Sequence, residues 1–329
     1  MIKIMYPKRG SSVQTKDTAV TAAAQQILNQ VRKAVVGKDS ILLWVLAAIL
    51  ARGHILLEDV PGVGKTTMAL AFSRVLALDY SRVQFTPDVL PSDITGYSIP
   101  DPGTHALHYR PGSIITNLFL ADELNRATSR TQSALLEAME EGQVTVDGIS
   151  HPLPQPFVVI ATQNPVGAAG TQLLPDSQMD RFAVRLSLGY PSPRDEMDML
   201  LSRQNADPLM ELEPLLTRQQ LTAMQESVEE TFVSDAVVKY IVDLITATRQ
   251  NENILRGASP RATLAVTAMA RAVARLRGRD YVVPGDVQEV FVHTVAHRLL
   301  LSSRAEARGK QAERILWEIL ESVDAPKLR

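Results

Sequence analysis

Two kinds of hydrophobic pattern alternate along residues 21–191. Short, mostly apolar runs predict buried strands, and these lie at residues 54–58, 118–121, 157–161 and 184–186. Longer stretches repeat apolar residues at helical spacing, and these lie at residues 22–35, 41–51, 67–78 and 129–141. Buried strands separated by helices are typical of a parallel sheet that is covered on both faces. The pattern therefore predicts an α/β domain.

The pattern changes after Pro191-Ser192-Pro193, where the strand signals end. Beyond it the spacing predicts helices at residues 195–205, 218–230, 234–249, 261–276, 284–302 and 307–323. We therefore expect an α/β core over residues 21–191 and an all-helical second domain over residues 192–329. Residues 1–20 have little apolar periodicity, so we expect them to form a flexible N-terminal segment.

Composition narrows the class of protein further. Hydrophobic residues make up 45% of the 329 residues, and the formal net charge of −2 gives no general attraction to nucleic acid or to an anionic membrane. Because the sequence has no cysteine, disulfides, cysteine nucleophiles and thiolate metal sites are excluded. The longest apolar run, residues 41–51, is shorter than the roughly 20 residues of a membrane span, and the N-terminus lacks the apolar region of a signal peptide. We expect a cytoplasmic protein without a membrane segment.

The strongest chemical signal follows the first predicted strand. Residues 59–66, DVPGVGKT, fit the phosphate-binding motif G-x-x-x-x-G-K-[ST], except that Asp59 replaces the first glycine. In such a loop Lys65 binds the β- and γ-phosphates, and the hydroxyl of Thr66 binds Mg²⁺. An ordinary turn before a helix is the alternative, and the buried strand ahead of the loop disfavours it. We expect nucleotide contacts from Pro61, Gly62, Val63, Gly64, Lys65, Thr66 and Thr67.

Two carboxylates, Asp122 and Glu123, follow the second predicted strand directly. Open α/β sheets bind their ligands at the carboxyl ends of the strands. Beside a phosphate loop, Asp122 would therefore help to hold Mg²⁺, and Glu123 would polarise the attacking water as a general base. Without that loop, two ordinary acids at a helix start would be the simpler interpretation. The combination predicts an ATPase with ATP and Mg²⁺ at its site.

Several segments together resemble the MoxR family of AAA+ ATPases. They are residues 84–96, 120–126, 131–141, 143–148, 161–165, 174–182 and 257–262. The resemblance spans about residues 20–300, and it implies a P-loop AAA+ core, a helical lid and a nucleotide in the cleft between them. Asp59 resembles family members at its position, whereas Thr128 and Ser129 replace two prolines that the family often has.

The resemblance also assigns roles to residues outside the phosphate loop. Asn164 looks like sensor 1, a neutral amide that orients the lytic water, although an Asn before Pro is also a common turn residue. Arg181 matches the arginine finger that reaches the nucleotide of a neighbouring subunit. Arg261 resembles sensor 2, which contacts the phosphates of its own chain. For both arginines the alternative is a surface side chain. Val36 and Gly37 resemble the loop on the adenine side.

Two insertions interrupt the core. Residues 86–115 contain five prolines and are not a plain helix. Residues 143–156 alternate apolar and polar side chains around Asp147-Gly148, which predicts a β-hairpin. In the clade that the chain resembles, such elements face a central pore. The alternative is that they only lengthen the loops of the fold.

Two other patterns favour structural roles. Trp44 and Trp317 lie on apolar helical faces, so we expect both in the core. Four arginines between residues 271 and 279 form a basic run without interleaved aromatic residues. A solvated helix face explains this run better than a nucleic-acid patch.

The resemblance implies a homo-oligomer, in this class a hexameric ring, that remodels or matures other proteins as a chaperone. It further implies a client or adaptor protein with a von Willebrand factor A domain. Arg126 and Arg130 are further candidates for contacts across the subunit interface. Two alternatives stay open, a nucleic-acid motor of the helicase-like AAA+ clade and a nucleotide-gated scaffold with little turnover. The neutral charge balance makes nucleic acid the weaker of the possible partners.

Overall fold

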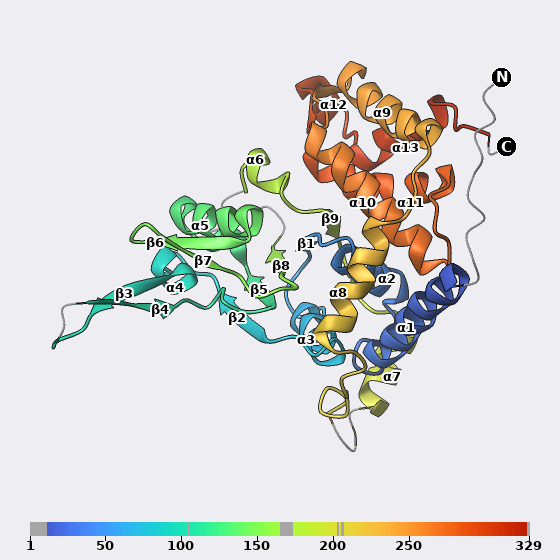
Figure 1. Ribbon diagram of the computed structural model, residues 1–329. Helices are drawn as coiled ribbons and strands as arrows, with labels where there is room; N and C mark the ends of the chain where they lie inside the picture. Colours follow the sequence, from blue (N-terminus) through green and yellow to red (C-terminus); the bar gives the residue numbers. More distant parts are fainter. Residues whose placement is uncertain (1–11, 104–105, 165–173, 203, 205–206, 328–329) are drawn as a thin grey trace, which may run out of the picture.

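A five-stranded parallel sheet lies at the centre of the protein (Figure 1). The computed structural model describes residues 12–103, 106–164, 174–202, 204 and 207–327. The strand order is β2-β5-β8-β1-β9. The strands are β1 (Ile55–Glu58), β2 (Tyr80–Gln84), β5 (Leu118–Asp122), β8 (Val158–Gln163) and β9 (Val184–Leu186). The predicted parallel sheet is confirmed, with β2 as an additional edge strand.

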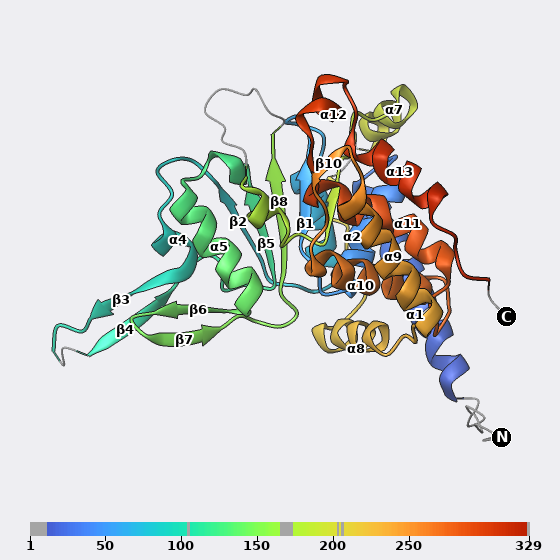
Figure 2. The same ribbon diagram turned by 90° about the horizontal axis from the view of Figure 1, so that it is seen from above.

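Side chains alternate between the two faces of this sheet. Ile55 and Leu57 pack against one group of helices, whereas Leu56 between them packs into a separate cluster on the other face. The first face is covered by α1 (Ser12–Ala34), α2 (Asp39–Leu50) and α3 (Lys65–Val75). The second is covered by α4 (Pro91–Thr95) and α5 (Ser129–Glu141). Figure 2 shows these layers on opposite sides of the strands, as a doubly wound fold requires.

Two helix starts bear on the sequence predictions. Helix α1 begins at Ser12, ten residues before the predicted start, so residues 12–20 of the expected flexible segment are helical instead. Residues 1–11 of the expected N-terminal segment lie outside the described residues. At α5, the hydroxyl of Thr128 accepts a hydrogen bond from the backbone N–H of Thr131 at 3.3 Å. Thr128 therefore caps the helix at a position where the MoxR family, which the sequence resembles, often has proline.

The second domain, the lid, is helical as predicted. Its helices are α7 (Pro193–Ser202), α8 (Arg218–Glu229), α9 (Asp235–Gln250), α10 (Pro260–Leu276), α11 (Pro284–Val295), α12 (Ser303–Ala307) and α13 (Ala312–Ser322), with a 3₁₀ turn at Ala296–Arg298.

One correction is needed, because the lid is not entirely helical. A short antiparallel pair joins β10 (Ile254–Arg256) to β11 (Leu300–Leu301), so the helix predicted over residues 284–302 ends early. A break after α12 follows, where Gly309 has a φ of +66° that other residues rarely adopt. The last predicted helix, residues 307–323, therefore begins only at Ala312, as α13, and α12 before it was not predicted.

The lid packs beside the sheet, next to strand β9 (Figure 1). Helix α10 contacts α1 and α2, and α11 contacts β9. As a result, the apolar residues of α9, α10, α11 and α13 belong to the same hydrophobic cluster as α1, α2, α3 and one face of the sheet. The α/β domain and the lid therefore differ in architecture but share one continuous hydrophobic interior.

Both insertions form hairpins on the side of the sheet away from the lid (Figure 1). The first contains β3 (Gly96–Pro100) and β4 (Leu107–Pro111). The second contains β6 (Gln143–Val146) and β7 (Ile149–Pro152), with a turn at Asp147-Gly148 where both residues have positive φ. The hairpin predicted over residues 143–156 is thus confirmed. The rings of Tyr109 and His151 stack at 3.7 Å between centroids, so the two hairpins support each other.

Two structural expectations from the sequence are only partly correct. Trp44 is buried, but Trp317 is 54% exposed on α13, since the buried face of that helix lies over Ile315, Leu316 and Ile319. Within the basic run, Arg275 is 4% exposed, and its Nε donates to the hydroxyl of Thr231 at 3.2 Å. The solvated face that we expected for the run is therefore wrong at this position.

Candidate functional site

The phosphate loop, residues 59–66, joins the carboxyl end of β1 to the start of α3. Gly62 and Gly64 have φ of +85° and +99°, which explains the two glycines. A Cβ at either position would meet nothing within 4 Å, so the loop faces open space. Because Gly64 caps α3, the first N–H groups of the helix lack a side-chain acceptor. This arrangement is suited to an anion such as phosphate.

A cavity of about 360 Å³ lies against this loop. Its walls come from the phosphate loop, from the carboxyl ends of β2 and β5, and from the residue after β8. The lining residues are Pro61, Gly62, Gly64, Lys65, Thr66, Thr67, Arg82, Gln84, Asp122, Glu123 and Asn164. We call it the phosphate cavity. It brings together most of the residues predicted from three separate segments, and all of its lining residues belong to the core.

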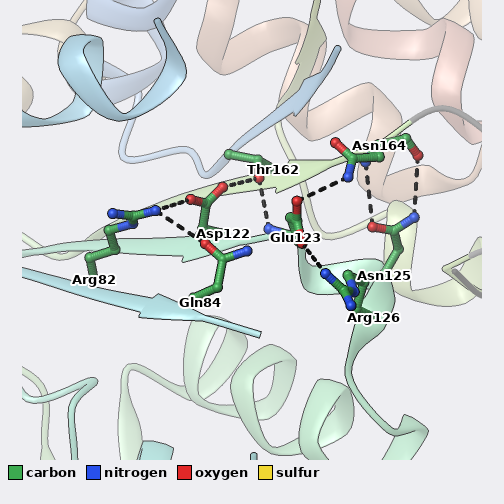
Figure 3. Close-up of polar contacts among 8 residues, drawn as sticks. All are labelled: Arg82, Gln84, Asp122, Glu123, Asn125, Arg126, Thr162 and Asn164. Carbon is green, nitrogen blue, oxygen red and sulfur yellow. Dashed lines mark hydrogen bonds and ion pairs between the residues drawn. The ribbon is translucent and has the colours of Figure 1, made fainter. Parts of the chain in front are cut away.

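Asp122 lies on the floor of this cavity within a network of hydrogen bonds (Figure 3). The hydroxyl of Thr162 donates to its Oδ1 at 2.6 Å, and Nη2 of Arg82 donates to its Oδ2 at 2.7 Å. The same Thr162 hydroxyl accepts the backbone N–H of Glu123 at 2.8 Å. Thr162 therefore aligns the two carboxylates, and Arg82 compensates the charge of the first.

Glu123 adopts an unusual backbone conformation, with a φ of +55°. Its Oε1 accepts a hydrogen bond from Nδ2 of Asn164 at 3.1 Å, and its Oε2 accepts one from Nη1 of Arg126 at 2.8 Å (Figure 3). The hydrogen bond from Arg126 is the main cause that lowers the pKa of Glu123 below its usual value. Glu123 is therefore ionised near neutral pH, as a general base must be.

Asn164 is itself held in place by a second amide. Its backbone N–H donates to Oδ1 of Asn125 at 3.4 Å, and its carbonyl accepts Nδ2 of Asn125 at 3.2 Å. This pairing fixes the end of β8 against the turn that follows Glu123. The predicted sensor residue and the predicted base thus touch each other directly.

Lys65 is buried at the start of α3. Its Nζ donates to the carbonyl oxygen of Asp59 at 2.7 Å and to that of Val60 at 3.4 Å. Burial lowers the pKa of Lys65, while the nearby Asp59, Asp122 and Glu123 act in the opposite direction. The net effect is a lowered pKa, and the three carboxylates offset part of the cost of burying the ammonium group.

The oxygen donors at this cavity fit Mg²⁺. Thr66 and Asp122 line the same space and offer a hydroxyl and a carboxylate, which are hard ligands. Among the described residues, no group of three or more His, Cys, Asp or Glu side chains could hold a metal ion by itself. Mg²⁺ at a phosphate loop needs only one or two protein ligands, since phosphate and water supply the rest.

Arg181 and Arg261 lie elsewhere, at the opposite edge of the sheet. Arg181 precedes β9, and Arg261 lies in the first turn of α10. Both bind the same carboxylate: Nε of Arg181 donates to Oε2 of Glu140 at 2.9 Å, and Nη2 of Arg261 donates to Oε1. They share a cavity of about 330 Å³ with Arg52, His54 and Arg298. We call this the arginine cavity.

The structure therefore places Arg261 away from the phosphate loop of its own chain, where we expected it to contact the phosphates. The phosphate loop follows the carboxyl end of β1, whereas the arginine cavity includes His54, which precedes its amino end. The four residues of β1 separate the two edges by about 13 Å at a rise of about 3.3 Å per residue. Helix α10 begins at the amino ends of the strands, because Arg261 in its first turn lines the same cavity as His54. We expected the nucleotide in a cleft between core and lid, but the cavity at the phosphate loop is lined by residues of the core alone.

Val36, Gly37 and Val63 also lie outside the walls of the phosphate cavity. Val63 packs against the hydrophobic core. Gly37 has a φ of +71°, and a Cβ added to it would lie 2.2 Å from the side chain of Asp195 in α7. The loop predicted to contact adenine thus lies against the first turn of the lid.

Sequence reasoning missed four residues of the site. They are Arg82, Gln84, Asn125 and Thr162. Arg82 and Gln84 belong to β2, whose mixed sequence YSRVQ gives no strong strand signal. Thr162 lies two residues before Asn164, and the only signal for it in the sequence was its place near the end of a buried strand.

Comparisons with known proteins identify the family of this chain. The family model for the ATPase family associated with various cellular activities (AAA) matches residues 54–184, and an AAA lid domain model matches residues 246–319. YeaC of Bacillus subtilis is 46% identical over 92% of this chain and 94% of its own length. Chaperone MoxR1 of Mycobacterium tuberculosis is 39% identical over 92% of this chain and 82% of its own length.

The chain belongs to the MoxR family of AAA+ ATPases. A crystal structure from Cytophaga hutchinsonii has the same fold, with a TM-score of 0.88 at 35% identity, over 96% of this chain and 98% of that one. Membership makes the chain an ATPase and implies that it binds nucleotide. Within the part of the chain that the structure describes, no helix has the length and apolar character needed to cross a membrane.

Proposed function

We propose that this chain hydrolyses ATP with Mg²⁺ as a ring oligomer, in this class a hexamer, and uses the energy to remodel partner proteins. The observation that carries the proposal is the separation of two complementary halves. The phosphate loop and the acid pair lie at the carboxyl edge of the sheet, while Arg181 and Arg261 lie together at the amino edge. Neighbouring subunits in a ring can unite these two halves.

At the carboxyl edge each residue has a separate task. Lys65 and the N–H groups at the start of α3 bind the phosphates. Thr66 and Asp122 hold Mg²⁺, which neutralises charge on the phosphates when it is bound. Glu123 accepts a proton from the attacking water, and Asn164 orients that water. Glu123 must then exchange at least one of its present hydrogen bonds for the water.

At the amino edge, Arg181 and Arg261 supply positive charge to the nucleotide of the next subunit. Both arginines already lie side by side, held by Glu140 with side-chain exposures of 26% and 47%. An arginine that stabilises the transition state from another subunit contributes roughly 10³–10⁵ in rate in related NTPases. Assembly of the ring would therefore control turnover.

Subunit mixing tests this division. Arg181→Ala subunits retain the phosphate cavity, and Lys65→Ala subunits retain Arg181, so each variant alone should hydrolyse ATP poorly. Mixed rings contain interfaces with an intact Lys65 on one side and an intact Arg181 on the other. We expect part of the activity to return on mixing, measured as phosphate release across a series of mixing ratios. Absence of rescue, in rings shown by fluorescence to exchange subunits, would indicate that Arg181 acts within its own chain.

For the client we propose a protein, with a von Willebrand factor A domain as the first candidate. Support comes from the name of the relative Chaperone MoxR1 and from the two hairpins, whose strands and turns (residues 96–111 and 143–152) contain a single Arg and no Lys. A nucleic-acid motor would need several cations there. The Glu123→Gln variant with ATP, and again with ADP, can be used to capture partners. Recovery of nucleic acid without protein in the ATP state would favour a motor, and full ATP binding with negligible turnover in every condition would favour a scaffold.

A further inference from the structure

Asp59 occupies the position where the phosphate-binding motif has its first glycine. Its φ is not positive, so the backbone does not require glycine there. The side chain is 6% exposed and turns toward the segment between β9 and α7, residues 187–192, which we call the β9–α7 segment. Its Oδ1 accepts the hydroxyl of Ser187 at 3.0 Å and the N–H of Gly189 at 3.1 Å, and its Oδ2 accepts the N–H of Leu188.

Lys38 binds the opposite set of groups on the same segment. Its Nζ donates to the carbonyl oxygens of Leu188 at 2.6 Å, Gly189 at 3.0 Å and Tyr190 at 2.9 Å. Lys38 is 9% exposed, and within the described part of the chain neither it nor Asp59 forms an ion pair. Two buried charges are thus satisfied almost entirely by one stretch of backbone. Burial of charge is costly without such partners, so the position of the segment is closely specified.

The β9–α7 segment also leads into the lid. After Ser192 the chain enters α7, whose Asp195 lies against Gly37, the residue before Lys38. The segment and the first turn of α7 therefore touch both the phosphate loop and the loop predicted to contact adenine. A movement of either loop must move this segment or break its hydrogen bonds.

We propose that Asp59 and Lys38 act as positioning residues that couple nucleotide binding in the phosphate loop to the orientation of the lid through the β9–α7 segment. The inference rests on the proposed function, since it needs ATP at this cavity. In the present structure Nζ of Lys65 donates to the carbonyl of Asp59, the same residue whose carboxylate holds the segment. Phosphate competes for that ammonium group, so nucleotide changes the bonding of Asp59 directly.

A coupling of this kind requires that nucleotide bind one arrangement of the segment better than another. The hydrogen bonds of Asp59 and Lys38 make only a few arrangements of the segment favourable, because five of the six involve backbone groups of consecutive residues. Loss of the carboxylate should leave the phosphate loop able to bind ATP, since glycine is the usual residue there. The same loss should leave the lid unable to respond.

Asp59→Gly is therefore the informative variant, because it restores the usual motif while it removes the clamp. We expect ATP affinity within about threefold of wild type and a kcat reduced by roughly tenfold or more, as the loss of hydrogen bonds to a charged group suggests. Hydrogen exchange over residues 187–202, followed with and without ATP in the Glu123→Gln background, should lose its nucleotide dependence. Lys38→Met, which removes the other side of the clamp, should give the same result.

Graded controls separate coupling from general destabilisation. Ser187→Ala removes one neutral donor and should lower kcat by only a few-fold. Asp88→Asn removes an exposed carboxylate elsewhere in the α/β domain. It should change neither kcat nor the nucleotide-dependent hydrogen exchange of residues 187–202. Unaltered kcat and unaltered nucleotide-dependent exchange in Asp59→Gly would overturn the coupling alone. Failure of the wild-type chain to bind ATP would instead overturn the proposed function, and the coupling with it.

Discussion

The two edges of the central sheet differ in how their charged groups are satisfied. At the carboxyl edge, Asp122 and Glu123 are held by Thr162, Arg82, Arg126 and Asn164, all from the core. At the amino edge, Arg181 and Arg261 are both held by the single carboxylate of Glu140, which is 35% exposed. The acid pair is thus held by several residues of the core, whereas the two arginines share a partly exposed carboxylate.

This difference shows which half of the site is prepared to change partners. Several hydrogen bonds from different strands fix the acids, so their geometry is set before a nucleotide binds. An exposed ion pair contributes only about 0.2–1 kcal/mol, so the arginines can leave Glu140 at little cost. Under the function proposed above, one chain contains both halves of an ATPase site, and the four residues of β1 separate them by about 13 Å.

The largest effects should come from the carboxyl edge. Lys65→Ala should abolish ATP binding, because the phosphates lose their charged partner. Glu123→Gln should retain binding and lower kcat by roughly 10²–10⁴, because only the general base is lost. Isothermal titration with ATP and a phosphate-release assay measure the two quantities. Equal loss of binding in both variants would contradict the separate tasks that we assign to them.

At the amino edge, Arg261→Ala should lower kcat by about 10² and leave ATP affinity of the isolated subunit unchanged, as removal of one charge-stabilising donor does. The reason is its position next to Arg181, far from the phosphate loop of its own chain. Binding to dilute, monomeric protein and turnover at concentrations that favour rings provide the measurement. A weakened affinity in the monomer would restore the contact in cis that the sequence led us to expect.

The free energy of unfolding should depend on pH through His54 at the amino edge. Nδ1 of His54 accepts the N–H of Val159 at 3.0 Å, and burial lowers the pKa of His54 to about 4. The neutral ring therefore contributes stability that is fully present above pH 6.5 and is lost as the pH falls toward 4. At pH 5 this loss amounts to about 2 kcal/mol. Urea unfolding at pH 7 and pH 5 measures it.

His54→Gln is the matched control, because it removes the titrating ring and keeps His297, whose pKa burial also lowers. The difference in unfolding free energy between pH 7 and pH 5 should be smaller in this variant than in the wild type. An identical pH dependence in both chains would show that His54 is already solvated.

The smallest effect concerns Glu140 itself. Glu140→Gln removes the charge that holds both arginines and should raise kcat by up to about fivefold, since an exposed ion pair of at most about 1 kcal/mol no longer has to break. Turnover at two salt concentrations checks this, because salt should narrow the difference between variant and wild type. A decrease would indicate that Glu140 positions the arginines for the next subunit.

Much of the core could be predicted from the sequence because local patterns determine it. Residues 184–186 and 129–141 were predicted with the bounds that the structure has, since a short apolar run and an amphipathic stretch need no distant information. The phosphate loop and the acid pair were equally local. Their meeting in one cavity followed from the rule that parallel strands end at a common edge.

Long-range packing explains what the sequence could not provide. The position of Arg261 depends on where the lid docks, and nothing in residues 257–262 encodes that. Asp59 looked like a departure from a motif, although it binds a segment about 130 residues further along the chain. Arg275 looked solvated because its partner, Thr231, lies on another element of the lid.

The shared hydrophobic cluster has a consequence for how the molecule comes apart. Since α9, α10, α11 and α13 complete the same apolar layer as α1, α2, α3 and one face of the sheet, neither part has a closed interior of its own. The face under α4 and α5 forms a second, separate cluster that carries the hairpins. The cooperative units of unfolding therefore follow the two sides of the sheet, with the lid melting together with one of them. A fragment cut at residue 191 would expose an apolar wall and aggregate, while the hairpin side can open locally and leave the rest intact.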